Sequence, residues 1–271
     1  MKATVFGAGG FIGSHLVRRL QAEGWDVLAL GRGDQRWRDA DLGHAFYCVG
    51  LTADFRSRPF ETIEAHVGFA TELLRNARFD SFLYLSSTRV YSGAADGRET
   101  SALAVNPTEA GDLYNLSKLL GEAACLAVPR PEVRIARVSN VFGRGMAADN
   151  FLMAIVREAV LNGRIDLRQA LESEKDYIAV EDVAAAMLRI SVAGGDRLYN
   201  LASGSNTTHA ALTGALTSLT GCTVTVEPGS LAARFPVIAT ERLQRLGFRP
   251  LRKPFQAVSE LAAAVAGAAA E

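Results

Sequence analysis

Short apolar runs rich in β-branched residues alternate with longer amphipathic stretches over most of the chain. The runs have the length of buried strands, and the stretches repeat apolar residues at helical spacing. This alternation is typical of βαβ units with a parallel sheet, so the sequence predicts an α/β fold. The expected strands are Ala3–Gly7, Trp25–Leu30, Ala45–Val49, Ser81–Ser87, Val133–Val138, Ile165–Leu167, Leu198–Ser203 and Thr223–Glu227.

The amphipathic stretches supply the expected helices. The first runs through Ile12 and Leu20 and stops at Gly24, a residue type that commonly ends helices. The others are expected at Pro59–Arg75, across Tyr114 and Lys118, at Phe151–Leu161, opening at Val180–Asp182, and near Thr208–Leu219. The alanine-rich segment Leu261–Ala270 is too short to span a bilayer, and we expect a surface helix or a frayed tail there.

Three glycines follow the first strand directly and open the first helix. Gly7, Gly10 and Gly13 are spaced Gly-x-x-Gly-x-x-Gly in the segment GAGGFIG. A tight turn, a backbone close to a pyrophosphate and a helix N-terminus aimed at the anion all favour residues without a Cβ. The alternative is a glycine-rich turn without a ligand, but the position between strand and helix favours a dinucleotide site. We expect the same cofactor to contact Phe11, Ile12 and Gly50.

The end of the second strand bears on the choice of cofactor. In the NAD version of this site a carboxylate, about 20 residues on, binds the ribose 2′-hydroxyl. Here the strand ends LALGRGD, so Gly31 and Arg32 stand where that carboxylate would fall. An arginine suits a 2′-phosphate, which favours NADP. The alternative is a solvated Arg32, with Asp34 serving the ribose of NAD.

Tyr114 and Lys118 are four residues apart and share one face of their expected helix. A neighbouring ammonium group favours the phenolate, which lowers the tyrosine pKa and suits acid–base chemistry near neutrality. The spacing alone is common and usually marks a solvated helix face. Its meaning therefore depends on the other motifs of the chain.

Together with Ser86-Ser87 at a strand end, these motifs resemble the extended short-chain dehydrogenases/reductases. More narrowly, they resemble the NAD-dependent epimerase/dehydratase family, which acts on nucleotide sugars. Further segments match family motifs in the right order over nearly the whole chain: YLSSTRVY (Tyr84–Tyr91), RVSNVFG (Arg137–Gly143), KDYIAVEDVA (Lys175–Ala184), YNLASG (Tyr199–Gly204) and LGFRP (Leu246–Pro250).

The resemblance implies a Rossmann doubly wound parallel sheet with a small C-terminal substrate-binding lobe. The NAD(P)-binding domain would comprise residues 1–143 and about 176–203. The lobe would comprise about 144–175 and 204–271. Relatives often pair through two long helices, here roughly 60–75 and 108–126, so the resemblance favours a homodimer.

The resemblance also assigns roles to single residues. Tyr114 would be the catalytic acid/base, and Lys118 would bind the nicotinamide ribose and depress the tyrosine pKa. Ser87 would be catalytic by hydrogen-bonding the reacting oxygen. Thr88 and Asn140 would contact the substrate, Asn140 at a diphosphate oxygen. The alternatives are a strand cap for Ser87, a loop-backbone role for Asn140 and a solvated Lys118.

The chain departs from the family pattern after its second strand. Only Arg32–His44 leads to the next strand, which is just enough for a crossover, so we expect edge strand 3 of the Rossmann order to be missing. The usual acidic adenine contact then has no counterpart. Trp37, Arg36 or Arg38 would cover the adenine instead, unless Trp37 packs on the sheet edge.

A second departure follows Ser87. Dehydratases of the family carry an Asp-Glu pair in the next two positions, and this chain has Thr88 and Arg89. Neither is a carboxylic acid, which argues against sugar dehydration. His66 replaces a common asparagine on the long helix, and we interpret it as structural.

Composition argues against several other classes of function. Lysine plus arginine and aspartate plus glutamate number 29 each, and this zero net charge gives no support to a nucleic-acid or membrane partner. The three cysteines are isolated, which favours a reducing cytoplasm, and the four histidines lack metal-ligand spacing. Strand-like residues from Ala3 leave no room for a signal peptide.

The expected activity is hydride transfer at a secondary alcohol or ketone of a nucleotide-linked hexose, most of all at C4, with NADP or NAD. A 4-epimerase, which retains its cofactor, and a 4-keto reductase, which exchanges it, share this chemistry. A reductase of a non-sugar carbonyl compound and a non-catalytic NADP-binding regulatory protein are the alternatives.

Overall fold

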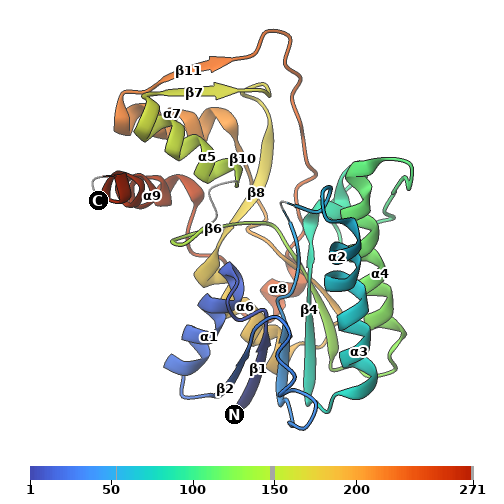
Figure 1. Ribbon diagram of the computed structural model, residues 1–271. Helices are drawn as coiled ribbons and strands as arrows, with labels where there is room; N and C mark the ends of the chain where they lie inside the picture. The colour runs from blue at the N-terminus through green and yellow to red at the C-terminus, as the bar shows by residue number, and fades with distance from the viewer. Residues whose placement is uncertain (53, 147–149, 270–271) are drawn as a thin grey trace.

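The computed structural model describes residues 1–52, 54–146 and 150–269, and its centre is a six-stranded sheet (Figure 1). All strand pairs of this sheet are parallel, in the order β2-β1-β3-β4-β5-β9. The strands are β1 (Lys2–Phe6), β2 (Asp26–Leu30), β3 (His44–Tyr47), β4 (Ser81–Ser87), β5 (Val133–Val138) and β9 (Leu198–Leu201). The predicted α/β fold with a doubly wound parallel sheet is confirmed.

The predicted loss of edge strand 3 is also confirmed for the residues that the structure describes. β2 pairs with β1 alone, and residues 31–43 lead directly to β3 on the other side of β1. Trp37 in this connection is buried, with its ring 6.1 Å from that of Phe69. It therefore packs in the hydrophobic core on one face of the sheet, and the idea that it covers an adenine is wrong.

Helices cover both faces of the sheet (Figure 1). One face carries α1 and α6, with the short α8 against β9, and the other face carries the helices from α2 to α4. Their bounds are α1 (Phe11–Ala22), α6 (Val180–Ala193), α8 (Glu241–Arg245), α2 (Pro59–Ile63), η1 (Glu64–Gly68), α3 (Phe69–Asn76) and α4 (Leu113–Ala127). The helix predicted at Pro59–Arg75 thus contains a π-helical turn, η1, which the hydrophobic pattern did not indicate.

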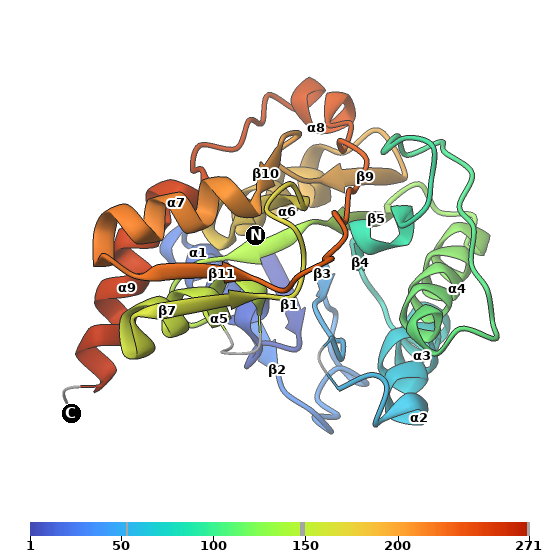
Figure 2. The ribbon, with the colours of Figure 1, turned by 90° about the horizontal axis from the view of Figure 1, so that it is seen from above.

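A smaller layer lies above the carboxyl ends of the sheet strands (Figures 1 and 2). It holds a three-stranded sheet, β10-β8-β6, and a two-stranded one, β11-β7. The elements are β6 (Asn140–Phe142), α5 (Phe151–Arg157), η4 (Glu158–Asn162), β7 (Arg164–Leu167), β8 (Glu174–Ala179), β10 (Asn206–Thr208), α7 (His209–Thr220), β11 (Thr223–Val226) and α9 (Pro254–Ala269). The predicted lobe range 144–175 also includes residues 147–149, which lie outside the described residues.

The C-terminal helix corrects an expectation. α9 begins at Pro254 rather than Leu261, and its side chains at Val258, Leu261 and Val265 are buried in a core shared with α5 and α7. One helix face is therefore part of the interior while the other is exposed, so the segment is a packed surface helix and not a frayed tail. Ala270, the end of the predicted segment, lies outside the described residues.

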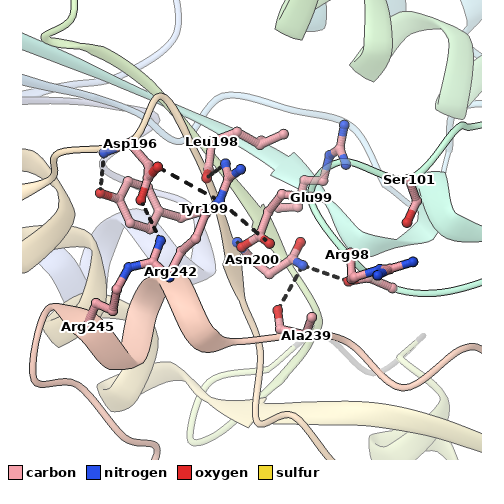
Figure 3. A network of polar contacts seen from close by, with 12 residues as sticks. Arg98, Glu99, Ser101, Asp196, Leu198, Tyr199, Asn200, Ala239, Arg242 and Arg245 are labelled. Carbon is pink, nitrogen blue, oxygen red and sulfur yellow. Dashed lines mark hydrogen bonds and ion pairs between the residues drawn. The ribbon is translucent and has the colours of Figure 1, made fainter.

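A buried polar network ties α4 to the sheet. The Arg137 guanidinium on β5 donates to the Glu122 carboxylate on α4 at 2.7 Å, and to the Tyr91 hydroxyl at 2.8 Å. That hydroxyl donates to the Asn200 side chain on β9, whose amide nitrogen reaches the carbonyl oxygens of Gly97 and Ala239. Figure 3 shows Asn200 at this outer end, next to Glu99 and Ala239.

Replacing Arg137 by methionine should lower the free energy of unfolding by roughly 3–5 kcal/mol, because the Glu122 carboxylate is left buried without its partner. Urea denaturation followed by circular dichroism measures the loss. Arg98→Met is the matched control, since its ion pair with Asp96 lies on the surface and should contribute almost nothing. Equal losses in the two variants would contradict the role of the buried pair.

Candidate active site

The glycine loop is held between the ends of β2 and β3. The N–H groups of Gly7 and Ala8 donate to the Leu30 carbonyl at 3.0 and 3.1 Å. Gly7 has a φ of +77°, and a Cβ there would lie 2.9 Å from the Cys48 carbonyl oxygen. A Cβ on Gly13 would collide with the Gly7 carbonyl. Only glycine fits these positions, because the loop folds back onto the helix that it opens.

The start of α1 suits an anion. The cap residue, Gly10, has no side chain that could cap the helix, and the first turn contains no acidic residue. Its backbone N–H groups therefore point outward at the positive end of the helix dipole. The loop and this helix end together fit the pyrophosphate of a dinucleotide. Phe11 and Ile12 lie half-buried in the same turn.

Arg32 lies exposed just beyond the end of β2. Asp34, the alternative ribose partner, is already engaged: its carboxylate is 2.6 Å from the Arg36 guanidinium. Hydrogen bonds from Arg36 lower the pKa of Asp34, and Arg36 also donates to the Ala29 carbonyl at 3.1 Å. Within the described residues, no hydrogen bond or ion pair engages the Arg32 side chain.

Tyr114 is buried at the start of α4, among three side chains from other elements. Its ring centroid lies 5.6 Å from Phe55, 5.3 Å from the edge-on ring of His66 and 5.3 Å from the Arg89 guanidinium. Burial raises the pKa of Tyr114 above its usual value, because the phenolate loses hydration. A hydrogen bond with Ser87 and the charge of Arg89 oppose this rise.

Lys118 lies one turn further along α4 and is buried as well, so it is not the solvated lysine of the alternative interpretation. Its ammonium group donates to the Leu85 carbonyl at 2.9 Å and lies 5.2 Å from the Tyr84 ring centroid. Burial lowers the pKa of Lys118 to about 7, although the Glu122 carboxylate opposes the change. A Cβ on Gly50 would lie 3.4 Å from this nitrogen, so Gly50 borders the lysine.

Ser87, Thr88 and Asn140 occupy the same end of the sheet. The Ser87 hydroxyl accepts from the Arg89 N–H at 3.2 Å, so it caps the strand end as well as contacting Tyr114. Thr88 is buried beside it. The Asn140 side-chain amide donates to the Asp176 carbonyl at 2.9 Å, so it binds the backbone of the neighbouring strand β8 rather than that of a loop.

His66 has more contacts with the site than the sequence indicated. Its Nε2 accepts from the Leu51 N–H at 3.3 Å, which places the ring proton on Nδ1, 2.8 Å from the Ser117 hydroxyl. Ser117 in turn donates to the Tyr114 carbonyl. Burial and the Lys118 charge keep the pKa of His66 far below its usual range, so the ring is neutral.

Cationic side chains surround the mouth of the site. Arg56 and Arg89 both approach Gly111, and the Arg89 charge together with burial lowers the pKa of Lys175. Lys175 belongs to a matched motif. The sequence did not predict Arg56 at the site, because this residue belongs to no motif. Arg89 was considered only because it replaces the carboxylic acid of the dehydratases.

A cavity of about 720 Å³ lies in the smaller layer, between α5 and the strands β7 and β11. Phe151, Arg164 and Arg168 are among its lining residues. The Lys175 ammonium group lies 5.8 Å from the Phe151 ring centroid, so the cavity borders the cationic mouth.

Neither a metal-binding cluster nor a membrane-spanning helix occurs among the described residues. In the ranges 1–52, 54–146 and 150–269, no three or more His, Cys, Asp or Glu residues are grouped so that they could hold a metal ion. No helix formed by these residues is both long and apolar enough to span a bilayer.

Gly13→Ala should lower the free energy of unfolding of the protein by about 1–3 kcal/mol, because the new methyl group has no space beside the Gly7 carbonyl. Gly9→Ala is the control within the same loop, since a Cβ there would meet no atom within 4 Å. Urea denaturation in the absence of nucleotide measures both. The same stability for both variants would show that the loop is not closed as described.

Comparison with known proteins agrees with this geometry. The curated dTDP-4-dehydrorhamnose reductase of Mycobacterium tuberculosis (strain CDC 1551 / Oshkosh) is 28% identical over 208 residues, covering 71% of this chain. The chain spans 66% of that relative's length, just under two thirds. The structure of MoeE5 in complex with UDP-glucose and NAD has a TM-score of 0.82 at 21% identity over 100% of both chains.

A second solved structure, RMD from Pseudomonas aeruginosa complexed with NADPH, has a TM-score of 0.81 at 20% identity, over 98% of this chain and 100% of that one. Likeness at such identity shows a shared fold. The model of the NAD dependent epimerase/dehydratase family matches residues 3–202. The predicted resemblance is therefore confirmed, and the chain belongs to this family of extended short-chain dehydrogenases/reductases.

Proposed function

We propose that the protein is an NADP-dependent oxidoreductase of a nucleotide sugar, acting at a secondary alcohol or ketone, most of all at C4. The observation that carries the proposal is the buried Tyr114, one helical turn from the buried Lys118, at the sheet end that also bears Ser87 and the glycine loop. In open α/β sheets, ligands bind outside the carboxyl ends of the strands, where the strand order reverses. Here that point lies between β1 and β3.

Each residue of this arrangement has one task. When bound, the nicotinamide dinucleotide supplies or accepts the hydride. The glycine loop and the N-terminus of α1 hold the pyrophosphate, and Gly50 and Lys118 border the nicotinamide ribose. Ser87 orients the substrate oxygen, and Tyr114 gives that oxygen a proton during reduction or takes one during oxidation. Lys118 adds positive charge near Tyr114.

The smaller layer would supply the substrate site. The boundaries between this lobe and the NAD(P)-binding domain would lie near residues 143, 176 and 203. Lys175 and Arg168 suit a diphosphate. Asn140 and Thr88 would contact the sugar end. Thr88 and Arg89 offer no carboxylic acid for dehydration.

Reduction is favoured over epimerisation by Arg32, which suits the exchangeable NADPH. A 4-epimerase is the second candidate, because the family includes epimerases by its description. A regulatory protein without catalysis would not need Tyr114 and Lys118 buried together. A homodimer is proposed through α2–α3 and α4, where Phe60 and Leu120 are 81% and 55% exposed.

Incubation with a panel of nucleotide sugars and NADPH tests the activity. Tyr114→Phe should lower kcat about 10²- to 10⁴-fold, because the proton donor is lost. Tyr199→Phe is the matched control: its hydroxyl accepts from the Asp196 N–H, and its loss should leave turnover intact. Stoichiometric loss of NADPH indicates a reductase, and product without net loss an epimerase. No turnover of any sugar, with Tyr114→Phe indistinguishable from wild type, would refute the proposal.

Arg32→Ala should weaken NADPH binding about tenfold or more, which corresponds to about 1.4 kcal/mol, while NADH binding changes little. The reason is the loss of the charge-assisted contact with the 2′-phosphate. Arg19→Ala is the control, since that guanidinium already pairs with Glu23 on the surface. Titration of protein fluorescence with each nucleotide gives the affinities. Equal NADPH affinity in wild type and Arg32→Ala would remove the argument for NADP.

A further inference from the structure

Arg89 contacts both members of the proton-transfer pair. Its backbone N–H donates to the Ser87 hydroxyl at 3.2 Å, and its guanidinium lies 5.3 Å from the Tyr114 ring centroid. The guanidinium is held in place from two other sides. It donates to the Gly111 carbonyl at 3.2 Å and lies 5.0 Å from the Phe55 ring centroid. A residue on the turn η2 (Thr88–Tyr91) thus bridges β4 and the start of α4.

Lys118 is less well placed for the same electrostatic task. Its ammonium group is directed at the Leu85 carbonyl, and its charge weakens near neutral pH because burial lowers its pKa to about 7. A guanidinium stays protonated throughout the working range of pH. Arg89 is therefore the cation that keeps its charge at Tyr114 while Lys118 titrates.

The other groups around Tyr114 do not replace this charge. His66, on η1, is neutral, and Phe55 is apolar. Asp112, just before α4, exerts its negative charge on Arg89 and bonds to the Asn115 side chain. Arg56 and Lys175 lie further out, and both repel Arg89. Of the side chains that the structure describes around the phenol, Arg89 is the one whose charge lowers the pKa of Tyr114.

We propose that Arg89 supplies the positive charge that stabilises the Tyr114 phenolate, while its N–H turns the Ser87 hydroxyl toward the phenol. Because the N–H occupies one lone pair of the Ser87 oxygen, the hydroxyl proton is free to point at Tyr114 or at the substrate. Arg89 acts through these two residues and is a positioning residue. The proposal deepens the function proposed above and rests on it for its catalytic consequence. Its electrostatic part can be tested without turnover.

The test is an ultraviolet titration of tyrosinate, with the Tyr114→Phe spectrum subtracted so that only Tyr114 is followed. In Arg89→Met, which keeps a long apolar stem, the Tyr114 pKa should rise by about 1 or more. Arg89→Lys restores a cation and should return the Tyr114 pKa most of the way to its wild-type value. Arg56→Met is the matched control, because that guanidinium lies 4.5 Å from the Phe55 ring centroid, and it should leave the Tyr114 pKa unchanged. Near-ultraviolet circular dichroism verifies folding, and Arg89→Gln replaces any methionine variant that does not fold.

The pH profile gives a second readout. In the oxidative direction Tyr114 must be a phenolate, so the acid limb of kcat/KM should move to higher pH in Arg89→Met by as much as the Tyr114 pKa rises in the titration. At a fixed pH below that limb, a rise of about 1 in this pKa lowers the rate about tenfold, and the decrease should be in kcat rather than KM. A merely structural role would lower activity without moving the limb.

Three results would overturn the proposal: an unchanged Tyr114 pKa in folded Arg89→Met or Arg89→Gln, an equal rise in Arg56→Met, or no recovery in Arg89→Lys. Failure of the wild type to turn over any nucleotide sugar overturns the proposed function instead. In that case the tyrosinate titration still decides the electrostatic role of Arg89.

Discussion

The buried ion pair between Arg137 and Glu122 is the interaction on which the reactive end of the molecule depends. Removing two charges from water is costly, and the cost is offset only where every polar atom finds a partner. Here the Arg137 guanidinium donates to both Glu122 and Tyr91, and the Tyr91 hydroxyl donates to the Asn200 side chain. The pair therefore fixes α4, β5, η2 and β9 against one another. Glu122 lies one turn beyond Lys118, so the same pair also helps this lysine to keep its proton.

The site also requires that η1 and α4 approach the sheet closely. The π-helical turn η1 leaves carbonyl groups at Ala65 and His66 that accept from the hydroxyls of Tyr47 and Tyr84, at 2.6 and 2.9 Å. Gly121 allows α4 to approach the Tyr84 hydroxyl, since a side chain there would collide with it. His66, on η1, lies against Tyr114, on α4, with the two ring centroids 5.3 Å apart. π turns of this kind are frequent at functional sites.

The sequence predicted those parts of the fold whose signal is local. Strands such as Ser81–Ser87 and Val133–Val138 are almost entirely buried and contain several apolar residues, and their predicted bounds agree with the structure. The strands β6, β8 and β10 were not predicted, because their pairing partners are distant in sequence. The spacing of Tyr114 and Lys118 placed both on one helix. It did not indicate that Lys118 donates to Leu85, nor that Arg89 and Phe55 lie over the phenol, because burial and long-range contacts decide both.

The connection after β2 has a consequence for the behaviour of the protein in solution. An edge strand exposes backbone donors and acceptors that invite pairing with a strand of another molecule, the first step toward aggregation. In this chain the segment after β2 folds back along that edge: Arg36 donates to the Ala29 carbonyl, and Trp37 fills the space beneath. Arg32, which forms no ion pair among the described residues, also places a charge where an incoming strand would have to dock. The short connection therefore hinders intermolecular β-sheet growth.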